Sequence, residues 1–289
     1  MVELTRSTKP DVSTVAGSIG AEIRGVDPRH EPHAAGEVVR SALTEHRVVV
    51  IRLDRPLSDA ELVDFAGTLG PVLVEYPDGP DCPPVEVIRV ITDERSGRPA
   101  PESGWPAVGL PWHNDYSYLP RPAQESLLMP IELPATGGGT TSFIDMVAAV
   151  DALDDQHRDD LRRSTVTCEL VPSFATKFGT DPGTVTTPLI VDHPGLGREV
   201  LWLGPAFGVI DGLDPVASEA RRESLVAHAA EHGRRYDHTW QLGDVVVFDN
   251  LAVMHERAPV PPEHRREMRQ VSTQLPNPVG RLRPRSVEP

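Results

Sequence analysis

The segment GDVVVFDNLAVMHERAP, residues 243–259, combines a turn, a buried strand and a histidine. A Gly-Asp pair gives the turn signal, and the run VVVF after it is apolar and rich in β-branched residues. Such a run is typical of a strand that is buried on both of its faces. An Asp-Asn pair ends the run, and His255 follows. The segment therefore predicts a β-rich core that carries a polar site beside one of its strands.

Other short apolar runs extend this pattern outward from the segment. They are VEVIRV (85–90), SLLMPIEL (126–133), TTSFI (140–144), STVTCEL (164–170), PLIVDH (188–193), EVLWLG (199–204) and MRQVSTQL (268–275). Two helical stretches lie between them, at about 146–163 and 215–232. Many short strands with few helices predict a sandwich or barrel with helices outside. We expect a single domain over residues 1–289, mainly β with flanking helices, on a distorted jelly roll.

The first third of the chain contributes more helix. HAAGEVVRSALTEHR (33–47) predicts a helix that leads into the buried strand VVVIRL (48–53). The clearest helical signal is LSDAELVDFAGTLGP (57–71), in which Ser58 is a candidate N-cap and Glu61 completes a capping box. Upstream, GSIGAEIRGVD (17–27) alternates polar and apolar residues and predicts a pair of strands. Residues 1–12 and 279–289 are expected to be flexible.

Charge and cysteine content exclude several classes of function. The formal net charge is −15, which argues against nucleic acid and against an anionic membrane surface, because both require a basic footprint. The sequence has no run of 18 apolar residues that would span a membrane. Cys82 and Cys168 do not form a CxxC pair, so a zinc ribbon is disfavoured and a reducing cytoplasm is expected.

The stretch PWHNDYSY (111–118) is the first half of a candidate metal site. Residues i and i+2 of a strand face the same way, so His113 and Asp115 are able to point into one cavity. Alone, this pair also fits a core histidine that hydrogen-bonds a nearby carboxylate.

The distal segment adds the other half of the site. His255 supplies a second imidazole, and Arg266 follows eleven residues later. Two histidines and one carboxylate with open positions form the facial triad of non-haem Fe(II) oxygenases. A bidentate 2-oxo acid and O₂ fill the open positions in such enzymes. The far carboxylate of the 2-oxo acid requires a cation, and a planar guanidinium suits it.

Taken together, these motifs resemble the TauD/TfdA family, the taurine and chlorophenoxyacetate dioxygenases that depend on Fe(II) and 2-oxoglutarate. The resemblance covers nearly the whole chain. It is carried in order by GAEIRGVD, WHNDYSY, LPATGGGTTSFIDM, PLIVDHPGLGREVLWLG, VFDNLAVMHERA and RREMRQVST. It implies a double-stranded β-helix (cupin-like jelly-roll) core, with His113, Asp115 and His255 as catalytic iron ligands and Arg266 on the distal carboxylate of 2-oxoglutarate.

The resemblance also implies a threonine contact to the co-substrate and a type of reaction. Thr140 and Thr141 are both candidates in GGGTT, and Thr141 keeps the Thr-x-Phe order that follows the glycines. The implied chemistry is oxidative decarboxylation of 2-oxoglutarate to succinate and CO₂, coupled to attack on an unactivated C–H bond. Related halogenases lack the carboxylate that Asp115 provides, so hydroxylation or desaturation is expected.

The substrate is expected to be a small molecule. Family members that act on sulfonates or carboxylates use a second arginine four residues after the first, and this chain has Gln270 there. The segment LGPVLVEYPDG adds Glu75, Tyr76 and Asp78 near the expected site. Loss of a cation and gain of carboxylates predict a neutral or amine-bearing substrate, and a compound of secondary metabolism is expected.

The remaining candidate substrate contacts are Asn114, between the two proximal metal ligands, and Phe174, in the variable lid segment VPSFATKFG. Phe174 and Phe178 of that segment each fit either a pocket cover or a core aromatic. Two alternative functions stay open from the residues alone. One is a metal-dependent hydrolase that uses the His/Asp/His set, and the other is a non-catalytic jelly-roll binding protein. A homodimer is expected only from its general frequency among soluble enzymes.

Overall fold

The computed structural model describes residues 10–15, 17, 19–76, 83–92, 109–260 and 264–284. Its strands are β1 (Asp11–Thr14), β2 (Gly20–Arg24), β3 (Val48–Arg52), β4 (Ile88–Thr92), β5 (Leu110–His113), β6 (Ala123–Glu132), β7 (Thr141–Asp145), β8 (Thr165–Leu170), β9 (Gly183–Pro188), β10 (Ile190–His193), β11 (Arg198–Leu201), β12 (Val209–Ile210), β13 (Arg235–His238), β14 (Asp244–Asp249), β15 (Val253–Arg257), β16 (Arg266–Gln274) and β17 (Arg281–Pro284). Its helices are α1 (Pro32–His46), α2 (Asp59–Leu69), α3 (Met146–Asp151), α4 (Asp155–Arg163), α5 (Pro172–Lys177) and α6 (Pro215–His232).

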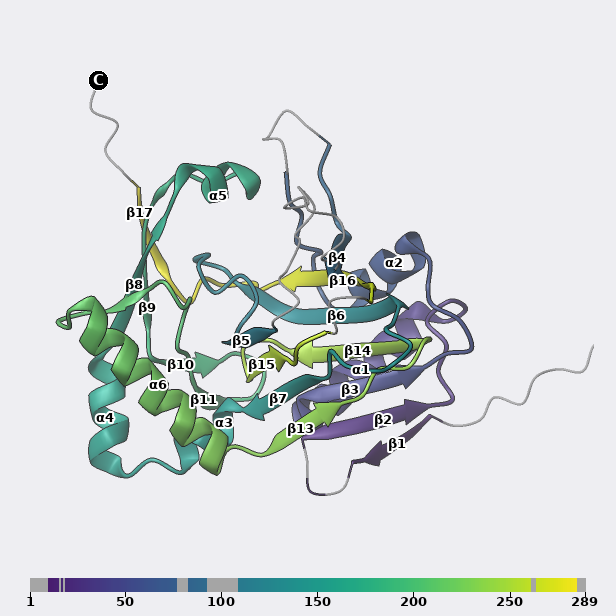
Figure 1. The fold of residues 1–289 in the computed structure, drawn as a ribbon, viewed down its shortest axis with the longest axis horizontal. Helices are drawn as coiled ribbons and strands as arrows, with labels where there is room; N and C mark the ends of the chain where they lie inside the picture. The colour runs from purple at the N-terminus through teal and green to yellow at the C-terminus, as the bar shows by residue number, and fades with distance from the viewer. Residues whose placement is uncertain are drawn as a thin grey trace, which may run out of the picture.

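Two sheets form the core of the molecule. The larger has the order β1-β2-β3-β14-β6-β16-β4, and the smaller has the order β13-β7-β15-β5. In Figure 1 the larger sheet extends across the right half with α1 and α2 against it, whereas α4 and α6 lie at the left beside β8 and β9. This arrangement confirms the prediction of a mainly β protein with flanking helices on a jelly-roll core.

The valine-rich strands are apolar along their whole length because both of their faces are buried. Val245 and Val247 of β14 pack in the core cluster that α1 and α2 cover. Val246 and Phe248 point the other way, into the cluster shared with Phe143 of the smaller sheet. β14 therefore belongs to two cores at once, which explains why the run VVVF contains no polar residue.

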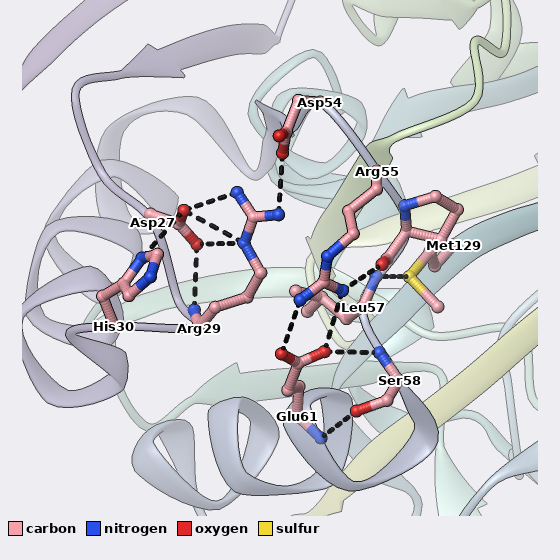
Figure 2. Close-up of polar contacts among 10 residues, drawn as sticks. Asp27, Arg29, His30, Asp54, Arg55, Leu57, Ser58, Glu61 and Met129 are labelled. Carbon is pink, nitrogen blue, oxygen red and sulfur yellow. Dashed lines mark hydrogen bonds and ion pairs between the residues drawn. The ribbon is translucent and has the colours of Figure 1, made fainter.

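The predicted capping box at the start of α2 is confirmed (Figure 2). The Ser58 hydroxyl accepts a hydrogen bond from the Glu61 amide at 3.2 Å, and the Glu61 carboxylate accepts one from the Ser58 amide at 2.7 Å. The Arg55 guanidinium pairs with the same carboxylate at 3.0 Å. The pKa of Glu61 falls to about 2 because Arg55 and the Ser58 amide both stabilise its charged form. Local polar contacts thus cap the start of the helix.

Several elements differ from the sequence-based expectations. The helical stretch expected at about 146–163 is two helices, because Asp145 caps α3 and Asp154 caps α4. Within GSIGAEIRGVD only β2 forms, and it pairs with β1 and β3 rather than within the segment. The C-terminal segment expected to be flexible includes β17, which pairs with β9. No helix within the described ranges is long and apolar enough to cross a membrane.

Candidate metal and co-substrate site

The two histidines of the predicted site face each other across paired strands of the smaller sheet. His255 of β15 is in register with His113 of β5, and also with Phe143 of β7 on its other side. The two imidazole centroids are 4.1 Å apart. His113 Nδ1 lies 2.8 Å from the Pro111 carbonyl oxygen. The other ring nitrogen, Nε2, therefore remains available on the cavity side. Strand pairing alone therefore brings together residues that lie far apart in the chain.

Asp115 reaches the histidines from a turn, because β5 ends at His113. Tyr116 then takes a positive φ of 54°, which bends the chain away from the strand direction. Asn250 holds this turn: its side-chain oxygen accepts from the Asp115 amide at 2.8 Å, and its side-chain nitrogen donates to the Asp115 carbonyl at 3.0 Å. The prediction that both ligands lie on one strand was wrong, but the turn places them in the same cavity.

Asn114 points into the protein body instead of the cavity. Its amide nitrogen donates to the Asn250 carbonyl at 2.8 Å and to the Val253 carbonyl at 2.7 Å. The side chain is buried. It therefore fastens the turn after β5 to the start of β15, and the prediction of a substrate contact is replaced by this structural role.

The three ligand atoms surround one point. Asp115 Oδ1 lies 3.8 Å from His113 Nε2 and 3.7 Å from His255 Nε2, and all three residues offer atoms within 4.8 Å of one another. Burial raises the pKa of Asp115, and burial with the charge on His113 lowers the pKa of His255 well below its usual value. A divalent cation bound here would offset the cost of the buried carboxylate and would take one lone pair from each imidazole. The donor set therefore fits a first-row metal of the Fe(II) type.

Arg266 is a second buried charge in the same cavity. Only 2% of the residue is exposed, and its Nη2 makes a single long hydrogen bond of 3.5 Å to the Gly139 carbonyl. Within the described part of the chain its Nε has no hydrogen-bond partner. Burial and the neighbouring Arg257 guanidinium lower the pKa of Arg266 to about 9. A carboxylate bound at this point would supply the missing acceptor.

Of the two candidate threonines, Thr141 lines the cavity with Arg266 and the ligand residues. Its hydroxyl oxygen accepts from the Trp240 indole at 3.0 Å, so the hydroxyl proton is left to donate. Thr140 is not in the cavity wall, and its carbonyl accepts from the Ala258 amide at 2.9 Å. The Thr-x-Phe alignment and the geometry agree on Thr141.

The cavity lies between the two sheets. Its wall is formed by Val90, Leu110, His113, Asp115, Leu128, Thr141, His255, Arg257, Arg266, Met268 and Gln270. On β16 the three alternate residues 266, 268 and 270 face it, as the period of a strand requires. The apolar wall residues and Arg257 were not among the predicted site residues, because nothing in a single sequence shows which apolar residues border a cavity.

The predicted substrate residue Glu75 is already occupied by protein partners. Its carboxylate accepts from the Tyr116 hydroxyl at 3.0 Å and pairs with the Lys177 ammonium of α5 at 2.5 Å. The amide of the next residue, Tyr76, donates a hydrogen bond to the Lys177 carbonyl at 2.7 Å. Phe174 of α5 is 39% exposed and stacks on Tyr118 with centroids 5.1 Å apart. None of these residues lines the cavity. Asp78 lies outside the described residues.

A jelly roll that holds two histidines, a carboxylate and a buried arginine in one cavity defines the class of 2-oxoglutarate-dependent oxygenases. The model of the "Taurine catabolism dioxygenase TauD, TfdA family" matches residues 9–272. The chain belongs to this family, and it is an α-ketoglutarate-dependent dioxygenase that uses 2-oxoglutarate and O₂.

Known proteins similar to the chain agree with this assignment. Pentalenolactone F synthase of Streptomyces arenae is 31% identical over 267 residues, which cover 84% of this chain and 88% of that protein. The (S)-phenoxypropionate/alpha-ketoglutarate-dioxygenase of Delftia acidovorans is 29% identical over 87% of this chain and 90% of that protein. A crystal structure of a taurine dioxygenase from Burkholderia xenovorans superposes with a TM-score of 0.74 at 25% identity, over 94% of this chain and 92% of that one.

Proposed function

We propose that this dioxygenase binds Fe(II) through His113, Asp115 and His255, and that it binds the distal carboxylate of 2-oxoglutarate through Arg266 and Thr141. The observation that carries the proposal is the position of Arg266. A buried guanidinium with an unused donor in the wall of a His/Asp/His cavity is costly unless an anion binds there. A metal-dependent hydrolase or a binding protein would need such a cation only for an anionic ligand of its own.

Different residues of the chain would have different roles in the reaction. His113, Asp115 and His255 would hold the metal, which supplies the O₂ chemistry when bound. Arg266 and Thr141 would orient 2-oxoglutarate, which is oxidised to succinate and CO₂ while the substrate C–H bond is hydroxylated or desaturated. The apolar side chains Leu128 and Met268 would keep water from the reacting atoms.

We further propose a neutral, predominantly apolar substrate. Four apolar side chains, Val90, Leu110, Leu128 and Met268, contribute to the cavity wall. The alternative of an amine-bearing substrate depended on Glu75, whose charge is already paired with Lys177. The similarity to pentalenolactone F synthase supports a small molecule of secondary metabolism.

An anaerobic titration tests the metal and co-substrate roles. Adding Fe(II) and 2-oxoglutarate to the purified protein is expected to give a weak visible charge-transfer band, and air is expected to release succinate slowly. His255→Ala should abolish the band. Activity with zinc alone and without O₂ would instead favour a hydrolase.

Succinate release with matched substrate sets tests the substrate class. Neutral polycyclic or aromatic compounds are expected to stimulate release more than their amine or carboxylate counterparts of the same size. Stimulation by amines or sulfonates alone would refute the proposed substrate class.

A cytoplasmic location and a homodimer complete the proposal. The first is supported by the cysteine usage and by the need for 2-oxoglutarate, and cell fractionation tests it. The second is supported only by the frequency of symmetric dimers among enzymes, and sedimentation velocity tests it.

A further inference from the structure

Gln270 lines the cavity and also contacts a predicted metal ligand. Its side-chain nitrogen donates to Asp115 Oδ2 at 2.9 Å. Ser126 of β6 donates its hydroxyl proton to the same oxygen at 2.8 Å. Ser272 lies next to Ser126, and the two hydroxyl oxygens are 3.0 Å apart. Because Ser126 uses its proton on Asp115, Ser272 must be the donor in that second contact.

The two carboxylate oxygens of Asp115 therefore have separate surroundings. Oδ2 is held by two donors from neighbouring strands of the larger sheet, β6 and β16. Oδ1 lies toward both imidazoles. The terminal torsion of an aspartate is broad and easily rotated, so these two donors are what fixes the plane of the carboxylate.

We propose that Gln270 is a positioning residue that makes Asp115 a one-oxygen ligand. This inference rests on the proposed metal site. With Oδ2 held at the larger sheet, Asp115 is unable to chelate the metal through both oxygens. A metal held by His113, Asp115 and His255 through one atom each would keep positions for the 2-oxo acid and for O₂.

A neutral donor suits this position better than a cation. A lysine or arginine beside Asp115 would form an ion pair with the carboxylate and compete with the metal for its charge. The amide of Gln270 fixes the direction of the carboxylate and leaves its full charge to the metal. One N–H of the Gln270 amide makes this contact, and the side chain keeps its second N–H and its carbonyl oxygen on the cavity side.

Cobalt binding provides a test that does not depend on turnover. Gln270→Leu and Ser126→Ala each remove one donor to Oδ2. Gln274→Leu is the matched control, since Gln274 lies on the same strand and uses its side-chain oxygen to accept from Arg121 at 3.0 Å, away from the metal. For each variant, the affinity for Co(II) is measured by calorimetry and the visible ligand-field spectrum of the Co(II) protein is recorded.

The proposal predicts that Gln270→Leu weakens Co(II) binding about tenfold, the lower end of the usual effect of losing a partner of a metal ligand. The ligand-field spectrum should change shape, because the coordination number changes. Ser126→Ala should alter the spectrum in the same direction, and the double variant should lose less than the product of the two single effects. Gln274→Leu should match the wild type in both measurements.

Two results would overturn the inference, and they differ from failure of the metal site itself. One is an unchanged Co(II) affinity and spectrum in Gln270→Leu together with a raised KM for the organic substrate, which would make Gln270 a substrate contact. The other is an unchanged ligand-field spectrum in Gln270→Glu, because the new carboxylate should repel Asp115 and change its position. This variant also provides the test if Gln270→Leu fails to fold. Absence of Co(II) binding by the wild type would overturn the proposed function as well.

Discussion

The two faces of β16 carry charged residues in opposite circumstances. On the face toward α2, Arg269 donates to Asp59 at 3.0 Å and also pairs with Glu267, which Arg265 contacts in turn. On the face toward the cavity, Arg266 has one long hydrogen bond to a carbonyl and lies next to another arginine. Arg266 and Arg269 lie three residues apart on one strand. The fold gives Arg269 carboxylate partners, and it gives Arg266 a carbonyl at 3.5 Å.

This difference separates structural charges from binding charges. A buried charge costs free energy unless a partner compensates it. On the α2 face the chain supplies the partners, so the charges stabilise the folded state. On the cavity face, Arg266 Nε has no acceptor among the described residues. In the proposed function, the carboxylate of the co-substrate would supply that acceptor.

The largest expected effect comes from Arg266. Arg266→Gln should weaken binding of 2-oxoglutarate to the metal-loaded protein on the order of 100-fold, because a paired guanidinium contributes about 3 kcal/mol to a buried carboxylate. The melting temperature should stay the same or rise, since an uncompensated charge is removed. Calorimetry with 2-oxoglutarate measures the first effect and thermal unfolding the second. A large drop in melting temperature with unchanged affinity would reverse the roles assigned to the two faces.

Glu125 of β6 tests whether another buried charge behaves like Arg266. Burial raises the pKa of Glu125 to about 7, and the carboxylate of Asp249, its partner in register on β14, adds to the shift. The hydroxyl of Thr273 donates to Glu125 and opposes the shift, as does the more distant charge of Arg40.

The sign of the pH dependence follows from this raised pKa. Between pH 4.5 and about 7 the folded state keeps a proton on Glu125 that the unfolded chain has lost, so stability falls as pH rises through that range. The loss is at most about 3 kcal/mol. Glu125→Gln should remove this slope and be the more stable protein at pH 8, as measured by urea unfolding at several pH values. Parallel stability curves for the two proteins would contradict the assignment.

Arg269 lies on the face of β16 toward α2, and its substitution can be compared with that of Arg266. Arg269→Gln should lower stability by about 2 kcal/mol, because it leaves Glu267 without one of its two cations and breaks the contact to Asp59 at the start of α2. Affinity for 2-oxoglutarate should change less than twofold. Paired with Arg266→Gln, the variant forms a matched comparison of the same substitution on both faces. Loss of co-substrate affinity here would mean that the two faces are not independent.

The smallest effect is expected at the start of α2. Ser58→Ala removes the acceptor for the Glu61 amide and should cost about 1 kcal/mol. Ser58→Asp preserves a cap and should recover most of that loss. Both variants should bind 2-oxoglutarate as the wild type does. Equal stability of all three proteins would show that the capping box contributes nothing in this fold.

The sequence was most informative where local chemistry decides the outcome. Capping by Ser58 and the buried valine strands could be predicted, because each depends on nearby residue types and their spacing. The His/Asp/His set with Arg266 was expected from the resemblance to a known family, since its members lie far apart in the chain. Thr141 could be preferred over Thr140 from its distance to Phe143, and its place in the cavity wall agrees.

The direction and partners of the other side chains depend on residues far away in the chain. Asn114 and Gln270 were expected to contact substrate, but Asn114 binds carbonyls near β15 and Gln270 binds Asp115. Glu75 was expected to be available, and Lys177, about a hundred residues later, neutralises it. A single sequence does not show which polar residues will meet across strands.

The most direct test of the central claim is a crystal structure of the protein with Mn(II) and the unreactive analogue N-oxalylglycine. We predict an anomalous peak at bonding distance from His113 Nε2, Asp115 Oδ1 and His255 Nε2, with the distal carboxylate of the analogue on Arg266 and Thr141. A metal bound elsewhere, or an analogue whose carboxylate leaves Arg266 without a partner, would contradict the account.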